Sequence, residues 1–287
     1  MAEVIDWLLD GDPAIGWQVQ RDLLDDPYEQ TLAQVETQGW GARLLSHRES
    51  DGTWPTGWYS PKWTSTFYSM QVLQLLGVPA PESVRALRDF ALHDGGIFTP
   101  WSARHDDLCV TGMMLGMSRF AGVEMPGAID RLLSTQSPDG GWNCRRADSH
   151  SSLHTTLSVL EGLAGFEGGS DVAAAARRGR EFLLAHHLYR SHRTGEVISA
   201  GFTRFSFPYY WFYDVLRALD YWRGHPWDDR LTGAVDLVRA KGRDGRWNLQ
   251  NKHAGRTWFD MEQPGRPSRW NTLRAMRVLR WVDGCCP

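Results

Sequence analysis

The sequence predicts an all-α protein built as a barrel of six helical hairpins, an (α/α)6 toroid, and three observations lead to that prediction. Turn-like segments of related sequence recur at 50–54, 93–97, 138–142, 193–197 and 243–247, reading SDGTW, HDGGI, PDGGW, RTGEV and RDGRW. An amphipathic segment precedes these turns, and a segment that is apolar nearly all round follows them. Repeated helical units of this kind, with faces that alternate between half-buried and fully buried, require two layers of helices.

The elements can be placed in order along the chain. Residues 4–9 form a first amphipathic segment, and Asp12-Pro13 then reads as an N-cap followed by proline at the first helical position. The outer helices have apolar faces at helical spacing, as in 84–91, 128–133 and 231–238. The inner helices are expected at 13–24, 64–77, 107–120, 151–165, 209–222 and 268–281. No flexible linker interrupts this series, and no polar capping repeat of an open solenoid is visible, so residues 1–287 are expected to form one domain with few or no strands.

Composition narrows the classes of function. The net charge of -3 and the pI near 6.4 give no electrostatic basis for binding nucleic acid or an anionic membrane. The acidic N-terminus does not resemble a signal peptide, and the apolar run at 108–118 is too short to cross a bilayer. The four cysteines do not form a disulfide framework, so a cytoplasmic protein is expected. A protein partner is possible but is not indicated.

Three potential metal ligands occupy matching places in two neighbouring repeats. Asp107 and Cys109 lie where the loop at 94–106 turns into an apolar helix, and His154 begins the next inner helix 45 residues after Cys109. Carboxylate, thiolate and imidazole are ligands that zinc prefers, and three protein ligands leave one coordination position for chemistry. We therefore predict Zn2+ bound by Asp107, Cys109 and His154. Singly, the cysteine and the histidine could equally be buried core residues, and Cys144 and His150 are possible substitute ligands.

The sequence LLSTQSPDGGW at 132–142 resembles the QW motif of terpenoid cyclases, with Gln136, Gly140 and Trp142 at the motif positions. Two other turns keep the glycine and the tryptophan. The whole chain is similar in its repeat pattern to the prenyltransferase and squalene-oxidase-repeat superfamily. This superfamily contains squalene–hopene cyclases, class II diterpene cyclases and the β subunits of protein prenyltransferases.

The resemblance implies two kinds of site. In the β subunits of prenyltransferases, Asp-x-Cys and a histidine on the next inner helix bind zinc, as Asp107, Cys109 and His154 would here, and a basic residue matching Arg104 holds a diphosphate. In the cyclases, the same helix start carries the Brønsted acid, and the segment Arg104-His105-Asp106-Asp107 places Asp106 and Asp107 there. His105 is predicted to contact the substrate beside Arg104.

Aromatic side chains gather at the predicted starts of several inner helices. The expected substrate-binding residues are Trp63, Tyr210, Trp211, Tyr213, Asp214 and Trp270, together with Arg104 and His105. Such rings suit an isoprenoid chain or a carbocation, although each of them could instead fill the core. The leading hypothesis is a zinc-dependent, prenyltransferase-like or squalene-cyclase-like enzyme that acts on an isoprenoid or similarly apolar substrate. The alternatives are a metal-free class II-type cyclase with Asp106 or Asp107 as the acid, a carbohydrate-active (α/α)6 enzyme that pairs these carboxylates with Asp214 or Glu196, and a toroid that binds a lipid or peptide without catalysis.

Overall fold

The structure of the protein, a computed structural model, describes residues 2–91, 107–145 and 150–285. It is mostly helical, which confirms the all-α class. The regular β structure of the described residues is one antiparallel ladder between the two-residue strands β1 (Trp247–Asn248) and β2 (Pro267–Ser268). No helix within these ranges is long and apolar enough to cross a membrane.

The helices fall into two sets that differ in burial. The first set is mostly buried and consists of α2 (Pro13–Val19), α5 (Thr66–Leu76), α7 (Leu108–Phe120), α9 (Leu153–Leu163), α11 (Val215–Trp222) and α13 (Arg269–Cys285), the last of which is buried mainly in its first half. The π-helix η1 (Gln20–Leu24), which continues α2, contains no fully buried residue. The second set is half-buried and consists of α1 (Ala2–Leu9), α3 (Glu29–Gln34), α4 (Gly39–Leu45), α6 (Pro81–Ala91), α8 (Ala128–Ser134), α10 (Ser170–Ala185) and α12 (Thr232–Lys241). Two short 3-10 helices, η2 (Ala200–Thr203) and η3 (Asp229–Leu231), lie in the connections.

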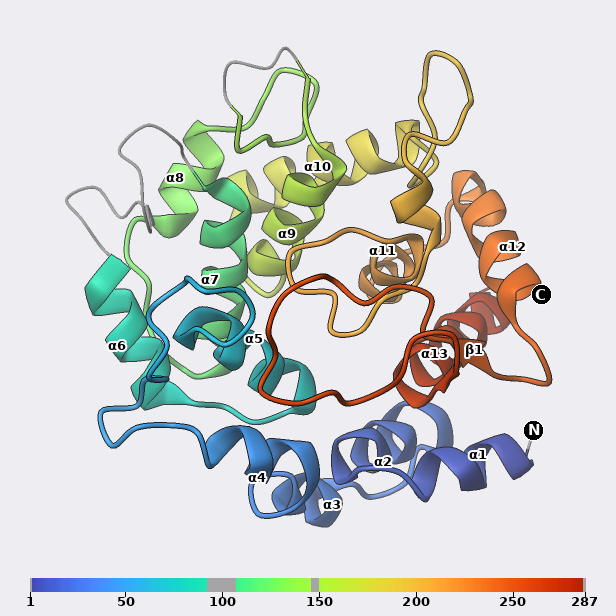
Figure 1. The fold of residues 1–287 in the computed structure, drawn as a ribbon. Helices are drawn as coiled ribbons and strands as arrows, with labels where there is room; N and C mark the ends of the chain where they lie inside the picture. The colour runs from blue at the N-terminus through green and yellow to red at the C-terminus, as the bar shows by residue number, and fades with distance from the viewer. Residues whose placement is uncertain (1, 92–106, 146–149, 286–287) are drawn as a thin grey trace.

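Figure 1 shows how the two sets are placed. Helices α5, α7, α9, α11 and α13 lie around the middle of the molecule, and α6, α8, α10 and α12 lie outside them. Each of α7, α9 and α11 packs against the outer helix that follows it, and α13 packs against both α11 and α2. Helices that are distant in sequence are therefore neighbours, and the C-terminal helix lies beside the N-terminal pair (Figure 1).

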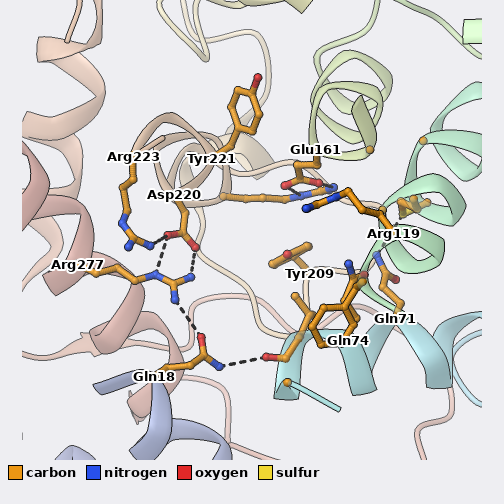
Figure 2. Close-up of a pocket in the computed structure, with 18 of the residues that line it drawn as sticks. Gln18, Gln71, Gln74, Arg119, Glu161, Tyr209, Asp220, Tyr221, Arg223 and Arg277 are labelled. Atoms are coloured by element: carbon orange, nitrogen blue, oxygen red, sulfur yellow. Dashed lines mark hydrogen bonds and ion pairs between the residues drawn. The ribbon is translucent and has the colours of Figure 1, made fainter. Parts of the chain in front are cut away.

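Buried ion pairs hold α13 to its two neighbours. The Arg277 guanidinium on α13 donates to both carboxylate oxygens of Asp220 on α11 (Figure 2). Its Nη1 also donates to Asp22 of η1 at 3.0 Å. Burial raises the pKa of Asp220, but the charge and hydrogen bonds of Arg277, together with the charges of Arg223 and Arg274, outweigh burial and lower the pKa of that carboxyl to about 2. These charges are therefore paired as they must be in a low-dielectric interior.

The inner helix expected at 209–222 begins later than predicted, at Val215. Tyr210 has φ 50, a left-handed conformation that a continuing α-helix does not permit. Asp214 is the N-cap, because its Oδ1 accepts the backbone N–H of Arg217 at 2.8 Å and its Oδ2 accepts the N–H and the hydroxyl of Ser206. The predicted cap at Asp12 is confirmed, and its carboxylate accepts the N–H groups of Ala14 and Trp40.

Three of the repeated turns, at 50–54, 138–142 and 243–247, are structurally equivalent, which explains their sequence. The predicted turn at 93–97 lies outside the described residues. The indole N–H of Trp54, Trp142 and Trp247 donates to a carbonyl in the preceding outer helix, at 3.2, 2.7 and 2.7 Å respectively. The backbone N–H of the same tryptophans donates to a threonine hydroxyl in the following inner helix, at 3.0 Å in each case. These threonines are Thr66, Thr156 and Thr272. Each tryptophan therefore connects one outer helix to one inner helix, as a repeated structural residue should.

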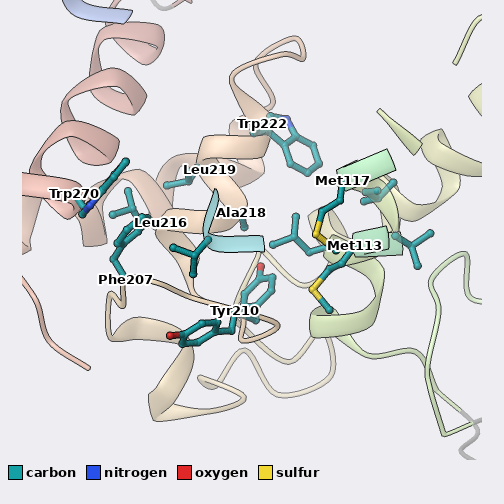
Figure 3. Packing of buried hydrophobic residues seen from close by; sticks show 14 of the residues in the cluster. Met113, Met117, Phe207, Tyr210, Leu216, Ala218, Leu219, Trp222 and Trp270 are labelled. Atoms are coloured by element: carbon teal, nitrogen blue, oxygen red, sulfur yellow. The ribbon is translucent and has the colours of Figure 1, made fainter. Parts of the chain in front are cut away.

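The core continues through the inner helices, as Figure 3 shows for Met113 and Met117 of α7, Leu216 and Leu219 of α11, and Trp270 of α13. Helices α7 and α9 approach most closely at two glycines. A Cβ on Gly162 would overlap the carbonyl oxygen of Gly112 and lie 2.9 Å from its Cα, and a Cβ on Gly112 would lie 2.8 Å from the Cα of Val159. The two backbones therefore touch, and this contact fixes the separation of the helices that carry Cys109 and His154.

Candidate functional site

A cavity of about 620 Å³ lies where α7 and α9 begin. Its described lining combines rings and aliphatic groups with polar side chains. The apolar part comprises Tyr59, Val110, Leu153, Ile198, Phe202 and Trp211, and the polar part includes Lys62, Asp107, Cys109, Asn143, Cys144, Arg145, His150, Ser151, Ser152, His154, Thr155 and His186. The volume lies within the range of small-molecule sites. The structure thus brings Asp107, Cys109 and His154, three predicted site residues from two helices, to one cavity.

Two cysteines form the chemically distinctive feature of this cavity. The Sγ atoms of Cys109 and Cys144 lie 3.1 Å apart, and the neutral Cys144 thiol donates a hydrogen bond to Cys109. When Cys144 is ionised, its thiolate instead accepts the hydrogen bond of the Cys109 thiol. The sulfur of Cys144 also accepts the backbone N–H of Cys109 in the first turn of α7, at 3.3 Å, and lies 3.4 Å from the Thr155 hydroxyl. The helix N-terminus adds partial positive charge at this position. All of these contacts favour negative charge on Cys144.

The acidities of the two thiols therefore differ. The hydrogen bond from Cys109, which outweighs burial, lowers the pKa of Cys144 to about 7. The same hydrogen bond, together with burial, raises the pKa of Cys109 well above its ordinary value. Near neutral pH, the Cys109–Cys144 pair loses one of its two protons. The resulting thiolate is mainly on Cys144, and Cys109 keeps its proton.

His154 is neutral in this environment. Burial, and next the positive charge of Arg217, lower the pKa of His154 to about 4. Its Nδ1 accepts the backbone N–H of Tyr213 at 2.9 Å, so the ring proton is on Nε2. Phe202 and Trp211 pack around the ring, with centroids at 5.2 and 5.5 Å. His154 is therefore a hydrogen-bond donor through Nε2, held in place by aromatic neighbours.

The predicted zinc ligands share the cavity, but they do not form a metal-binding cluster. Within residues 2–91, 107–145 and 150–285, no group of three His, Cys, Asp or Glu side chains is positioned to hold a metal ion. Two sulfurs bound to one tetrahedral zinc at 2.3 Å would lie roughly 3.8 Å apart, which is farther than the 3.1 Å between Cys109 and Cys144. Cys109 and Cys144 would therefore have to separate in order to bind one ion together. Zinc binding by Asp107, Cys109 and His154 stays a prediction, and no chemical step is assigned to a metal.

The predicted aromatic residues divide into one cavity residue and several core residues. Trp211 lines the cavity and stacks on Phe212 at 3.9 Å. Trp63 stacks on Tyr210 at 4.0 Å, and its indole N–H donates to the Ala254 carbonyl. The buried residues among those predicted to bind substrate are Trp63, Tyr210, Tyr213 and Trp270, and none of them is part of the described cavity lining.

Asp214, also predicted to contact a substrate, is completely buried and caps α11. Its two oxygens are engaged by Ser206 and by the backbone of Arg217, and it lies 3.7 Å from the Arg274 guanidinium. This carboxylate therefore stabilises the helix start. The predicted residues Arg104, His105 and Asp106 lie outside the described residues.

Sequence reasoning did not identify several cavity residues. Lys62 lies over the rings of Trp63 and Trp211, with its Nζ 5.6 and 5.3 Å from their centroids. Ile198 and Phe202 come from a long connection with no motif. Cys144 was recognised as a possible ligand but not as the partner of Cys109. Its position two residues after Trp142, at the turn that leads to His154, was the available signal.

Comparison with known proteins identifies no family and no activity for this chain. No family model matches the chain, and no curated protein matches it. One solved structure, titled as the crystal structure of a protein from Actinoplanes, is similar over 98% of this chain and 99% of its own, with 19% sequence identity and a TM-score of 0.49. This degree of likeness indicates neither a family nor an activity.

Proposed function

We propose that the chain is an (α/α)6 toroid and a prenyltransferase-like enzyme, which transfers an isoprenoid or similarly apolar group to a small nucleophile in the cavity at the starts of α7 and α9. The alternation of buried and half-buried helices supports the toroid, as do the contact between α13 and α2 and the three equivalent tryptophan turns. The thiol pair of Cys109 and Cys144, located inside a partly aromatic cavity, is the observation that carries the enzymatic proposal.

The cavity suits a substrate with one apolar and one anionic part. Trp211, Phe202 and Tyr59 offer apolar surface, while Lys62 and Arg145 supply positive charge to the same cavity. An apolar group that leaves with an anion, such as a prenyl diphosphate, presents both features. The aromatic faces also stabilise positive charge that develops on the transferred carbon.

In the proposed reaction, Cys144 acts as a general base. Its thiolate takes the proton of the attacking hydroxyl or thiol while that nucleophile bonds to the substrate carbon, and the anion departs with the electron pair toward Lys62 and Arg145. The proton on Cys144 then returns to solvent. A base with a pKa of about 7 is matched to neutral pH. His154 keeps its proton and can donate a hydrogen bond through Nε2.

Farnesyl diphosphate and a small thiol acceptor provide the test. Tryptophan fluorescence should report saturable binding of farnesyl diphosphate, the ligand should slow alkylation of Cys144 by iodoacetamide, and thioether formation should be lost in Cys144→Ala. Cys285→Ser is the matched control, because Cys285 is exposed at the end of α13. Absence of binding and of protection would refute the apolar substrate, and full turnover in Cys144→Ala would refute the base.

The same preparation tests the metal and acid alternatives. Equimolar zinc that is lost in Cys109→Ala and His154→Ala would establish the predicted zinc site and replace the mechanism above. Turnover of a polyprene that survives chelation and is abolished by Asp107→Asn would favour the metal-free cyclase. The carbohydrate alternative with Asp214 as the second catalytic carboxylate is weaker, because this side chain is buried and fully engaged. The pairing with Glu196 stays a prediction.

A further inference from the structure

A second cavity, of about 440 Å³, lies among the C-terminal halves of the inner helices, away from the thiol pair. Side chains of α2, α5, α7, α9, α11 and α13 all contribute to its wall. Figure 2 shows polar groups from these helices directed toward a common space. No residue of this wall belongs to the cavity of the proposed reaction.

The wall of this cavity carries an excess of positive charge. Five arginines contribute to it, namely Arg21, Arg119, Arg217, Arg223 and Arg277, against the two carboxylates of Glu161 and Asp220. Asp22 lies behind the wall as a third carboxylate and contacts three of the arginines. Five positive charges against three negative charges leave an excess of two.

Most of this charge is engaged, but two donors are not saturated. Arg217 binds Glu161 through Nε and Nη2 and also donates to the Phe212 carbonyl. Arg119 has no hydrogen bond or ion pair among the described residues, and its side chain reaches the cavity from the exposed end of α7. Arg223 donates to Asp220 through Nη1, while its Nη2 lies 3.8 Å from Asp22. Arg119 from α7 and Arg223 from the end of α11 therefore bring guanidinium groups to the wall from two different helices (Figure 2).

Deeper in the cavity, an acceptor lacks a donor. Gln71 is 4% exposed, and its Nε2 donates to the Tyr210 carbonyl at 2.8 Å, which fixes the orientation of the amide. Its Oε1 is buried and has no hydrogen-bond partner in the described structure. Leaving such an atom unpaired is costly, and a ligand hydroxyl or amine would satisfy it. The ring of Tyr209, beneath the Arg217 guanidinium at 4.5 Å, provides a flat wall between the two polar ends.

We propose that this second cavity binds a small anion that also carries a hydroxyl or amino group, with the anionic end at Arg119 and Arg223 and the donor end at Oε1 of Gln71. The anion is a phosphate monoester or a carboxylate, since guanidinium groups recognise both. The proposal is independent of the transferase chemistry at Cys144. Measurements of ligand binding therefore test this proposal without an activity assay.

Calorimetric titration of the full chain with glycerol 3-phosphate, L-malate, inorganic phosphate and glycerol tests the proposal. We expect saturable binding of glycerol 3-phosphate or of L-malate, which identifies the anion, with weaker binding of inorganic phosphate and no binding of glycerol. Arg119→Gln should weaken the affinity about tenfold, as expected for the loss of one charge-assisted hydrogen bond. Arg85→Gln is the matched control, because Arg85 lies on α6, outside the cavity, and its loss changes the net charge equally.

Gln71→Met provides a second variant, which removes the acceptor and retains side-chain length. It should weaken glycerol 3-phosphate or L-malate at least fivefold while inorganic phosphate binds as before, and circular dichroism checks that the variant is folded. No saturable binding of any of the three anions would overturn the proposal. Equal weakening by Arg119→Gln and Arg85→Gln would also overturn it, because binding would then depend only on net charge.

Discussion

The close contact of α7 and α9 predicts opposite effects for two chemically identical substitutions. In Gly162→Ala, the added methyl group meets the backbone of Gly112, with its carbonyl carbon at 2.8 Å and its Cα at 2.9 Å, and a backbone cannot yield as a flexible side chain does. The two helices must therefore separate. In Gly116→Ala, on the same face of α7, the nearest atoms lie at 3.8 to 3.9 Å, which is ordinary van der Waals contact.

The magnitudes follow from two terms. Overpacking a close contact costs about 1–3 kcal/mol or more, while alanine in place of a helical glycine gains about 1 kcal/mol. Because the added methyl group would overlap the Gly112 carbonyl oxygen, the overpacking cost in Gly162→Ala belongs at the upper end of this range, about 2–3 kcal/mol. Gly162→Ala should therefore lower the free energy of unfolding by about 1–2 kcal/mol, and Gly116→Ala should raise it by about 0.5–1 kcal/mol. Urea denaturation followed by tryptophan fluorescence measures both values. If Gly162→Ala were as stable as the original chain, the two backbones could not be in contact as described.

Three further predictions concern the turns, a cap and pH. Trp142→Phe leaves the Leu132 carbonyl without its donor and should cost about 1–3 kcal/mol in denaturation experiments, whereas Trp281→Phe, at a partly exposed site, should cost much less. Asp12→Ala removes the acceptor for Ala14 and Trp40 and should lower the melting temperature, with a loss of about 1–2 kcal/mol, while Asp10→Ala should leave it nearly unchanged. Burial lowers the pKa of His154 and of His253 to about 4 from 6.5, so the unfolded chain binds more protons between these pH values. The free energy of unfolding should therefore fall as the pH decreases from 6.5 to 4, and His154→Gln should make this decrease shallower; an unchanged slope in that variant would show that His154 is not buried in the neutral form.

The sequence was sufficient for the helical architecture because local chemistry determines it. The aspartate-glycine turns, the apolar periodicity and the Asp12-Pro13 start each depend on neighbouring residues, and the helices occur where these signals place them. The start at 209 was wrong because nothing local reveals that Asp214, rather than an earlier residue, accepts the N–H of Arg217. Phe90 has the spacing of a buried residue, but it is 42% exposed and stacks on Trp58 from another segment.

Only those parts of the candidate site that occupy equivalent positions in the sequence repeats could be predicted. Equivalent places in neighbouring repeats bring Asp107, Cys109 and His154 to one cavity, and the sequence contains that equivalence. The contact of Cys109 with Cys144 depends on how the 143–145 loop folds over α7, and no periodicity encodes it. Likewise, an aromatic residue near a helix start can face the cavity, as Trp211 does, or the core, as Trp270 does, and composition does not distinguish the two.

The packing of α13 against α2 has a consequence for how the molecule unfolds. Arg277 and Asp22 are 255 residues apart in sequence, yet their contact joins the last described helix to one of the first. Opening this contact would expose the apolar sides of both segments at once, together with the partners of Asp220 on α11. Linear helical arrays can unfold progressively from their ends, but in this chain such partial unfolding costs the contacts of both terminal segments. Unfolding should therefore be a single cooperative transition.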